Sequence, residues 1–174
     1  MSILVDERTA VLIQGITGRE ASMVTAHSLR YGTRVVAGVT PGRRGQRVHG
    51  VPVFDTVREA VATVGPVGAT VVYVPPASAL AAVREAVDAA IPLIVVMTER
   101  IPQRDVCTLL ALARLAGSLV VGPNSVGIIT PRARVKLGAI GGDAPQRCFQ
   151  PGRIGIISRS GCMTGECAWL MRRA

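Results

Sequence analysis

The feature that most constrains the fold of this 174-residue chain is an alternation of short apolar runs with longer stretches of helical character. Each run is apolar throughout, which is typical of parallel strands covered on both faces. Strands that alternate with helices predict βαβ units, and therefore an α/β fold with a Rossmann-type, doubly wound parallel sheet. The expected strands are Val11–Ile13, Val35–Ala37, Thr70–Val74, Leu93–Met97 and Leu119–Val121, and the expected helices are Glu20–Arg30, Thr56–Val64, Ser78–Ala90 and Gln103–Ala116.

Two of these helices carry start signals in the sequence. Thr56 is followed three residues later by Glu59, the spacing of a capping box. Ser78 stands before an alanine-rich stretch and is expected to cap the helix that follows.

The residue composition of the sequence changes after a turn at Gly122–Asn124. Residues 130–150 are rich in Pro, Gly and Arg and show no helical pattern. A strand is then expected at Arg153–Ile157, followed by a helix at Met163–Arg172. One strand and one helix do not make a domain, so they indicate an unfinished second unit. The predicted organisation is a Rossmann domain over 1–124, a linker or hairpin over 125–151, and the incomplete start of another domain over 152–174.

The net charge of +9 favours anionic partners. Nucleic acid is the first candidate, but an aromatic content of 3% leaves little to stack on bases. The basic residues are mostly scattered singly, except at Arg43–Arg44 and Arg172–Arg173. A small polyphosphate ligand accounts for such a local cluster equally well, and we expect no nucleic-acid partner.

Several other classes of protein are disfavoured. No apolar run approaches the roughly 18 residues that a membrane span requires, and Met1–Thr9 lacks the apolar core of a signal peptide. We therefore expect a cytoplasmic protein without a membrane partner. Four cysteines at irregular spacing, with no CxxC pair and only two histidines, disfavour a metal site.

The first predicted strand leads into a glycine-rich turn, Gln14–Glu20, which contains Gly15 and Gly18. A turn of this kind between a strand and a helix collects backbone N–H groups at a helix N-terminus, an arrangement that holds phosphate. The spacing is G-x-x-G rather than the full G-x-G-x-x-G. The alternative is a tight turn whose glycines only allow the helix to pack on the strand.

The second predicted strand is followed by Thr40–Gly45, which contains Arg43 and Arg44 but no acid. Rossmann folds that bind NAD usually place an acid there to bind the ribose diol. Two guanidinium groups instead favour a phosphate on the ribose. The 2′-phosphate of NADP and the 3′-phosphate of coenzyme A both fit, whereas NAD does not. A solvated loop with ordinary charges is the remaining alternative.

Two further turns are candidates for the ligand crevice. Met97, Thr98 and Glu99 end the fourth strand, where open α/β sheets bind ligands. Glu99 can equally pair with a neighbouring arginine, and the sequence does not make it a catalytic base. The turn that contains Ser160 and Gly161 begins a helix and could bind another phosphoryl group. It lacks the G-x-S-x-G pattern of a hydrolase nucleophile.

These segments, taken in this order, resemble the alpha subunit of succinyl-CoA synthetase and its relatives, and the resemblance extends over essentially the whole chain. The matching stretches are MSILVD (1–6), QGITG (14–18), YGT (31–33), GVTPG (38–42), GVPVF (50–54), TVREAV (56–61), YVP (73–75), GPN (122–124) and SRSG (158–161).

The resemblance implies a CoA-binding Rossmann domain followed by the start of a flavodoxin-like ligase domain. It places Gly15 and Thr17–Glu20 at the CoA phosphates, Arg43 at the position of a CoA-contacting lysine, and Met97–Glu99 beside the CoA. Ser160–Gly161 would open the helix that faces the phosphohistidine in the family.

The family joins a carboxylic acid to CoA through acyl phosphate and phosphohistidine intermediates. A beta-type subunit or fused partner supplies ATP or GTP with magnesium. Family alpha subunits continue past the length of this chain, and the phosphorylated histidine lies in that part. Neither His27 nor His49 replaces it, so we expect CoA binding without the full reaction and no catalytic residue in this chain.

Departures from the family pattern leave the acid open. Ser125 and Gly165 replace a cysteine and a tyrosine of the succinate enzyme, and 136–142 and 161–166 look more like ATP-citrate lyase or citryl-CoA synthetase. Succinate, malate and citrate all remain possible. A stand-alone CoA-binding regulatory module and an NADP-dependent oxidoreductase domain are the alternative functions.

Overall fold

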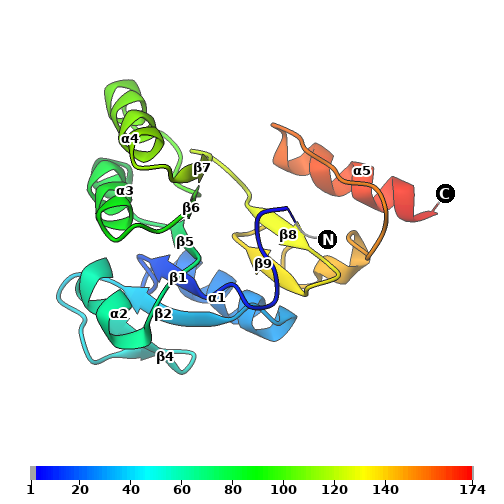
Figure 1. Cartoon of the computed structure of the whole chain (residues 1–174). Helices are drawn as coiled ribbons and strands as arrows, with labels where there is room; N and C mark the ends of the chain where they lie inside the picture. The colour runs from blue at the N-terminus through cyan, green and yellow to red at the C-terminus, as the bar shows by residue number, and fades with distance from the viewer. Residues whose placement is uncertain (1–2, 174) are drawn as a thin grey trace.

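The computed structural model of the chain describes residues 3–173, so the first two residues of the MSILVD stretch lie outside the described part (Figure 1). Its strands are β1 (Val11–Gln14), β2 (Val35–Val39), β3 (Arg47–Val48), β4 (Val51–Phe54), β5 (Ala69–Val72), β6 (Leu93–Val96), β7 (Leu119–Val121), β8 (Ile128–Thr130) and β9 (Val135–Leu137). Its helices are α1 (Arg19–Tyr31), α2 (Val57–Val64), α3 (Ala79–Asp88), α4 (Gln103–Leu115) and α5 (Gly161–Arg173), with short 3₁₀ turns at Pro76–Ser78 and Pro145–Arg147.

The main sheet has seven strands in the order β3-β4-β2-β1-β5-β6-β7. All neighbouring pairs are parallel except β3 with β4, which form an antiparallel hairpin at one edge. Counted along the chain without β3, the six parallel strands follow the order 3-2-1-4-5-6 of the dinucleotide-binding fold. The predicted α/β class with a Rossmann-type sheet is therefore confirmed.

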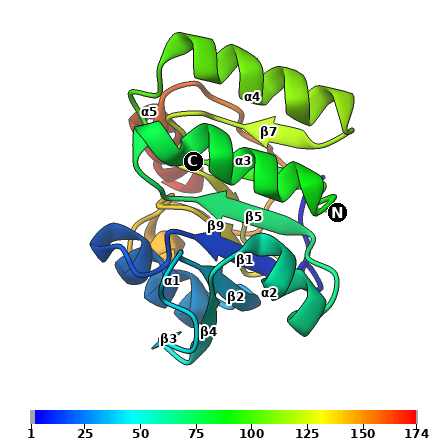
Figure 2. The same ribbon diagram turned by 90° about the vertical axis from the view of Figure 1, so that its left-hand side faces the viewer.

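Apolar side chains fill both faces of the sheet. Leu12 and Ile94 belong to a core shared with α2, α3 and α4. Val11, Ile13 and other alternate strand residues belong to a second core shared with α1 and β9. Figures 1 and 2 show α3 and α4 on one side of the sheet and the β8–β9 hairpin on the other. Burial on both faces is the reason why the central strands are mostly apolar. The two polar side chains buried in β1 and β5 pair with each other, since the Gln14 amide donates to Thr70 Oγ1 at 3.4 Å.

The β3–β4 hairpin was absent from the sequence-based prediction. Val51 and Val53 are buried, and β4 pairs with β2 through the Val53–Gly38 register, so β4 is a full parallel strand of the sheet. Pro52 interrupts its sequence pattern, and proline normally argues against a central strand. Here Pro52 faces Arg47 of the edge strand β3, where a missing N–H is tolerated.

The capping predictions had different outcomes. The Thr56 side chain accepts the N–H of Glu59 at 3.2 Å, as expected of a helix N-cap. The Glu59 carboxylate, however, accepts the N–H of Asp55 at 3.3 Å rather than that of Thr56. Ser78 occupies the N-cap position of α3, as predicted, but it also ends the 3₁₀ turn before the helix and its side chain makes no cap hydrogen bond.

Within residues 125–151 the chain forms the β8–β9 hairpin, which packs on α1 with Val135 and Leu137 buried. The helix expected at Met163–Arg172 forms as α5. The strand expected at Arg153–Ile157 was wrong, since these residues adopt no regular structure and Ile157 is 99% exposed. They pair with no other strand among the described residues, and a strand without a hydrogen-bonded neighbour is not stable. The three-part division of the chain stays a prediction.

Candidate ligand-binding crevice

The strand order reverses at β1, which lies between β2 and β5 in the sheet. At such a reversal the loops after neighbouring strands leave in opposite directions and open a crevice at the carboxyl ends of the strands. The loops that follow β1, β2, β5 and β6 lie at the carboxyl ends of neighbouring strands, where such a crevice is expected. Figure 2 shows the sheet edge with β1, β2 and β5 side by side. The predicted phosphate-binding turn (Gln14–Glu20), the arginine loop (Thr40–Gly45) and Met97–Glu99 all lie on these loops.

Gly15 begins the turn after β1 and adopts φ +81°, a conformation that favours glycine. Its N–H donates to the Val39 carbonyl at 2.7 Å. A side chain at Gly15 would place its Cβ 3.0 Å from the carbonyl oxygen of Tyr73, so the loops after β1 and β5 touch through backbone alone. Gly18 then closes the turn by donating to the Gly15 carbonyl at 2.9 Å.

Helix α1 starts at Arg19, with Gly18 at the N-cap position and no side chain that caps it. The first N–H groups of a helix have no intrahelical partner, and the helix dipole adds positive potential there. Gly18, Arg19 and Glu20 are exposed at this end. The geometry therefore offers amide donors to an anion, as predicted from the sequence, although Glu20 adds a negative charge.

Thr17 and Thr40 tie the loop after β1 to the loop after β2. The Thr17 hydroxyl donates to Thr40 Oγ1 at 3.2 Å, and the Thr40 hydroxyl donates to the Val39 carbonyl at 2.8 Å. Thr17 is half-buried in this contact. The structure thus brings the turn Gly15–Glu20 next to the segment that leads to Arg43.

The two arginines after β2 have different surroundings. Arg44 forms an ion pair with Glu59 at 3.6 Å. Within residues 3–173 the Arg43 guanidinium forms no ion pair, and Arg43 is exposed. An exposed guanidinium can bind a phosphate through two parallel N–H groups. Arg43 is therefore fully available to an anionic ligand, whereas Arg44 would have to share its guanidinium with Glu59.

The residues that follow β6 contribute backbone structure to the crevice. The Thr98 hydroxyl donates to the Val74 carbonyl at 2.7 Å, and the Thr98 carbonyl accepts the N–H of Asn124 at 3.0 Å. Thr98 therefore links the loops after β5, β6 and β7. Glu99 is exposed and lies 3.8 Å from Arg100, an exposed pair that carries little energy. Met97 is half-buried.

Ser160 and Gly161 lie at the N-terminus of α5. The Ser160 hydroxyl accepts the N–H of Met163 at 3.4 Å, so it caps the helix. A side chain at Gly161 would place its Cβ 2.4 Å from Val126 Cγ1, so the helix start packs on the segment that follows β7. Within residues 3–173 no hydrogen bond or ion pair joins Ser160 or Gly161 to the turn Gly15–Glu20.

Two residues of the site were not selected from the sequence. The Tyr73 carbonyl lies beside Gly15, whereas its side chain lines the closed space between α1, the sheet and the hairpin. Its buried hydroxyl has no hydrogen-bond partner within the described residues. Burial, together with the Glu20 carboxylate, raises the pKa of Tyr73 above its usual value. Asp55 follows β4 and accepts the N–H groups of Arg43 and Arg44. Tyr73 stood in a stretch shared with the resembled family, whereas no local signal marked Asp55.

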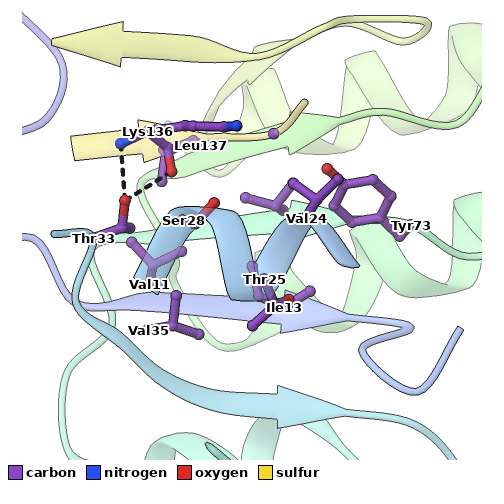
Figure 3. A pocket seen from close by; sticks show the side chains of 12 residues that line it. Val11, Ile13, Val24, Thr25, Ser28, Thr33, Val35, Tyr73, Lys136 and Leu137 are labelled. Atoms are coloured by element: carbon purple, nitrogen blue, oxygen red, sulfur yellow. Dashed lines mark hydrogen bonds between the residues drawn. The ribbon is translucent and has the colours of Figure 1, made fainter. Parts of the chain in front are cut away.

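A second, closed space lies between α1, the sheet and the hairpin, as Figure 3 shows. It is lined by apolar side chains such as Val11 and Ile13 and is too small to hold a water molecule. Thr33 Oγ1 donates to the Lys136 carbonyl and accepts the Lys136 N–H, both at 2.9 Å. The Lys136 amine donates to the Gly142 carbonyl, and burial lowers the pKa of Lys136 to about 8. This region is packed core rather than a ligand site.

Neither a metal site nor a membrane span is found in residues 3–173. No group of three or more His, Cys, Asp or Glu side chains in this range could hold a metal ion. No described helix has the length and apolar character needed to cross a bilayer.

Comparison with known proteins is consistent with this site. Residues 6–100 match the CoA binding domain family. The chain is 46% identical over 169 residues to the succinate–CoA ligase [ADP-forming] subunit alpha 2 of Archaeoglobus fulgidus, and covers 57% of that protein. It is 40% identical over 176 residues to the malate–CoA ligase subunit alpha of Methylorubrum extorquens, again covering 57%. The matches take in 97% and 99% of this chain, which thus spans little more than half of these relatives.

Among solved structures, the fold is similar to that of ATP citrate lyase from Methanothrix soehngenii in complex with citrate and coenzyme A. The TM-score is 0.82 at 23% identity, over 98% of this chain and 30% of that one. At this identity the similarity shows the fold alone.

Proposed function

The chain belongs to the CoA binding domain family, and from that premise we propose that its crevice binds coenzyme A by the phosphate groups. The uncapped N-terminus of α1 and the turn Gly15–Glu20 would receive the diphosphate. Arg43, on the loop after the next strand, would bind the 3′-phosphate. The single observation that carries this proposal is that Thr17 and Thr40 join these two anion-binding elements at the point where the strand order reverses.

We further propose that the chain is the CoA-binding portion of an NDP-forming acid–CoA ligase of the succinyl-CoA synthetase alpha type. Support comes from its 46% and 40% identity with the alpha subunits of succinate–CoA and malate–CoA ligases. The acid would be succinate, malate or citrate. A beta-type subunit would bind ATP or GTP with magnesium, as in the family that the sequence resembles.

We propose neither of the two histidines as the phosphorylated residue of such a reaction. His27 is half-buried on α1, where burial and the nearby Lys136 lower its pKa. His49 lies between β3 and β4, and its Nε2 is 3.1 Å from the Ser22 hydroxyl. The proposed role of this segment is therefore to bind CoA.

Calorimetric titration tests the CoA proposal. The chain should bind CoA, bind dephospho-CoA about 10- to 100-fold more weakly, and give no heat with NADPH, because a charge-assisted contact contributes about 1.5–3 kcal/mol. Binding of NADPH without binding of CoA by folded protein would contradict the proposal. The ligase proposal is tested separately, by co-purification with the beta-type subunit of a succinate–CoA ligase. Failure of that subunit to associate would leave a CoA-binding module without a ligase partner.

A further inference from the structure

The Asp55 carboxylate organises the arginine loop from beneath. Asp55 is the first residue after β4, and its Oδ1 accepts two consecutive backbone N–H groups, from Arg43 at 3.0 Å and from Arg44 at 3.2 Å. Asp55 is half-buried. A carboxylate that accepts two successive amides fixes the direction of the chain between them, because both N–H groups must point at one oxygen.

The loop consists of two consecutive turns that meet at Arg43. The Arg43 N–H donates to the Thr40 carbonyl at 3.1 Å, and the Gln46 N–H donates to the Arg43 carbonyl at 3.2 Å. Gly42 and Gly45, at the third position of the respective turns, adopt φ +72° and +85°. Glycine is conformationally permissive, so the turns alone order this exposed loop weakly. Backbone hydrogen bonds tie the second turn to β4, from the Gly45 N–H to the Val53 carbonyl at 3.1 Å and from the Val53 N–H to the Gln46 carbonyl at 3.0 Å. The Asp55 carboxylate is the side-chain contact that holds the backbone where the two turns meet.

Asp55 and Glu59 place the two arginines in different surroundings. Glu59 forms the ion pair with Arg44 at 3.6 Å, and its other carboxylate oxygen accepts the Asp55 N–H at 3.3 Å. The amides of Arg43 and Arg44 are already occupied by Asp55, so they are not free to cradle a phosphate. Anion recognition by this loop is thus left to its guanidinium groups, of which Arg43 is the one without an ion pair among the described residues.

We propose that Asp55 is a positioning residue for recognition of the ribose phosphate: it holds the backbone of the loop so that the Arg43 guanidinium projects toward the ligand. This inference rests on the proposed binding of CoA. In this proposal the Asp55 carboxylate, which follows β4, binds the protein backbone. The acid of NAD-binding folds instead comes directly after the second strand and contacts the ligand itself.

Asp55 has two opposing effects on the affinity for the phosphate, and substitutions at this position separate them. Ordering of the loop by Asp55 strengthens binding of the phosphate, whereas the negative charge of Asp55 weakens it by repulsion. Asp55→Ala removes both the acceptor and the charge. Asp55→Asn removes the charge but keeps a carbonyl oxygen at the same place. Asp88→Ala, at the exposed end of α3, changes the net charge equally at a distance from the loop and is the matched control.

The experiment is titration of the wild-type chain and the three variants with CoA and with dephospho-CoA, after a thermal melt has shown that each variant is folded. Asp55→Ala should lose about 3- to 10-fold in affinity for CoA, the effect of leaving a side chain and its loop to be ordered on binding. Its affinity for dephospho-CoA should not change. Asp55→Asn keeps the acceptor and loses the repulsive charge, so it should prefer CoA at least as strongly as the wild type does. Asp88→Ala should keep the wild-type preference.

An equal loss with both ligands would show a merely structural role and overturn the inference, as would unchanged or tighter CoA binding by Asp55→Ala. If Asp55→Ala does not fold, Asp55→Asn decides the question, because loss of its preference for CoA refutes a role based on the acceptor oxygen. Failure of the wild-type chain to bind CoA refutes the proposed function itself and this inference with it.

Discussion

Raising the pH from 7 to 9.5 should stabilise this protein, because of one buried amine. Lys136 is the only lysine in the sequence, and its side chain is 1% exposed between β9 and α1. Its amine donates to the Gly142 carbonyl. Burial lowers the pKa of Lys136 from 10.5 to about 8; the nearby Asp143 opposes that effect and Arg30 adds to it.

The sign of the effect follows from proton binding in the two states. The unfolded chain keeps the Lys136 ammonium up to pH 10.5, whereas the folded chain releases its proton near pH 8. Between these values the unfolded state binds more protons, so the free energy of unfolding rises as the pH is raised from 8 toward 10.5. The same stability is lost when the pH is lowered to 8 and below. From pH 7 to 9.5 the expected gain is about 2 kcal/mol.

Urea unfolding at pH 7 and 9.5, with a reductant for the four free cysteines, measures this gain. Lys136→Met keeps an unbranched apolar stem without the amine, and its stability should lack the rise. The range stops at pH 9.5 because burial raises the pKa of Tyr31 and of Tyr73, which removes stability as the pH passes their ordinary value of 10. Parallel changes in wild type and variant, or a fall in the wild type alone, would refute the reasoning.

Four substitutions test the packing and the capping of α2 by the same unfolding assay. Gly38→Ala would place a Cβ 2.4 Å from Ile16 Cγ2 and should cost about 1–3 kcal/mol, whereas Gly155→Ala meets open space and should change stability by less than about 0.5 kcal/mol; equal effects would contradict this account. Tyr73→Phe removes a buried hydroxyl without a partner and should leave stability unchanged or higher, so a loss of about 1 kcal/mol would reveal an unrecognised hydrogen bond. Thr56→Ala removes the cap of α2 and should cost about 1 kcal/mol, and a neutral result would argue against the cap.

The central strands could be predicted from the sequence because burial on both faces leaves a direct mark on it. Leu12 and Ile13 point to opposite cores, so neither position tolerates a polar residue. The edge strand β3 carries no such mark, since Arg47 is exposed and the pairing is short. An edge strand therefore needs tertiary information that the local pattern lacks.

The strand expected at Arg153–Ile157 shows the opposite error. Its isoleucines satisfy a local β pattern, but Ile154 is 69% and Ile157 is 99% exposed. Strand propensity mostly reflects packing against neighbouring strands and not a preference of the backbone itself. Without a neighbouring strand in the described chain, the apolar pattern has nothing to pair with.

The candidate site could be predicted only where one short segment contains all its parts. The turn Gly15–Glu20 is such a segment, because its glycines, the strand end and the helix start are contiguous in sequence. The contact between Asp55 and the N–H of Arg43 joins residues twelve positions apart, and it ends on a backbone atom that every residue but proline possesses. The identity of the side chain at position 43 therefore gives no indication of that contact.

The position of Asp55 in the sheet bears on which ligand the fold can bind. In a sheet of this order, a carboxylate directly after the second strand would face the ribose and accept its hydroxyl groups. Here the loop after β2 has no acid, and Asp55 arrives from the next strand along the sheet, where it accepts amides of the same loop. In the proposed complex, the Arg43 guanidinium would therefore face the ribose. A guanidinium in that place would disfavour an unmodified diol and favour a phosphate ester, so the strand that supplies the carboxylate would decide whether the sheet binds a phosphorylated ribose.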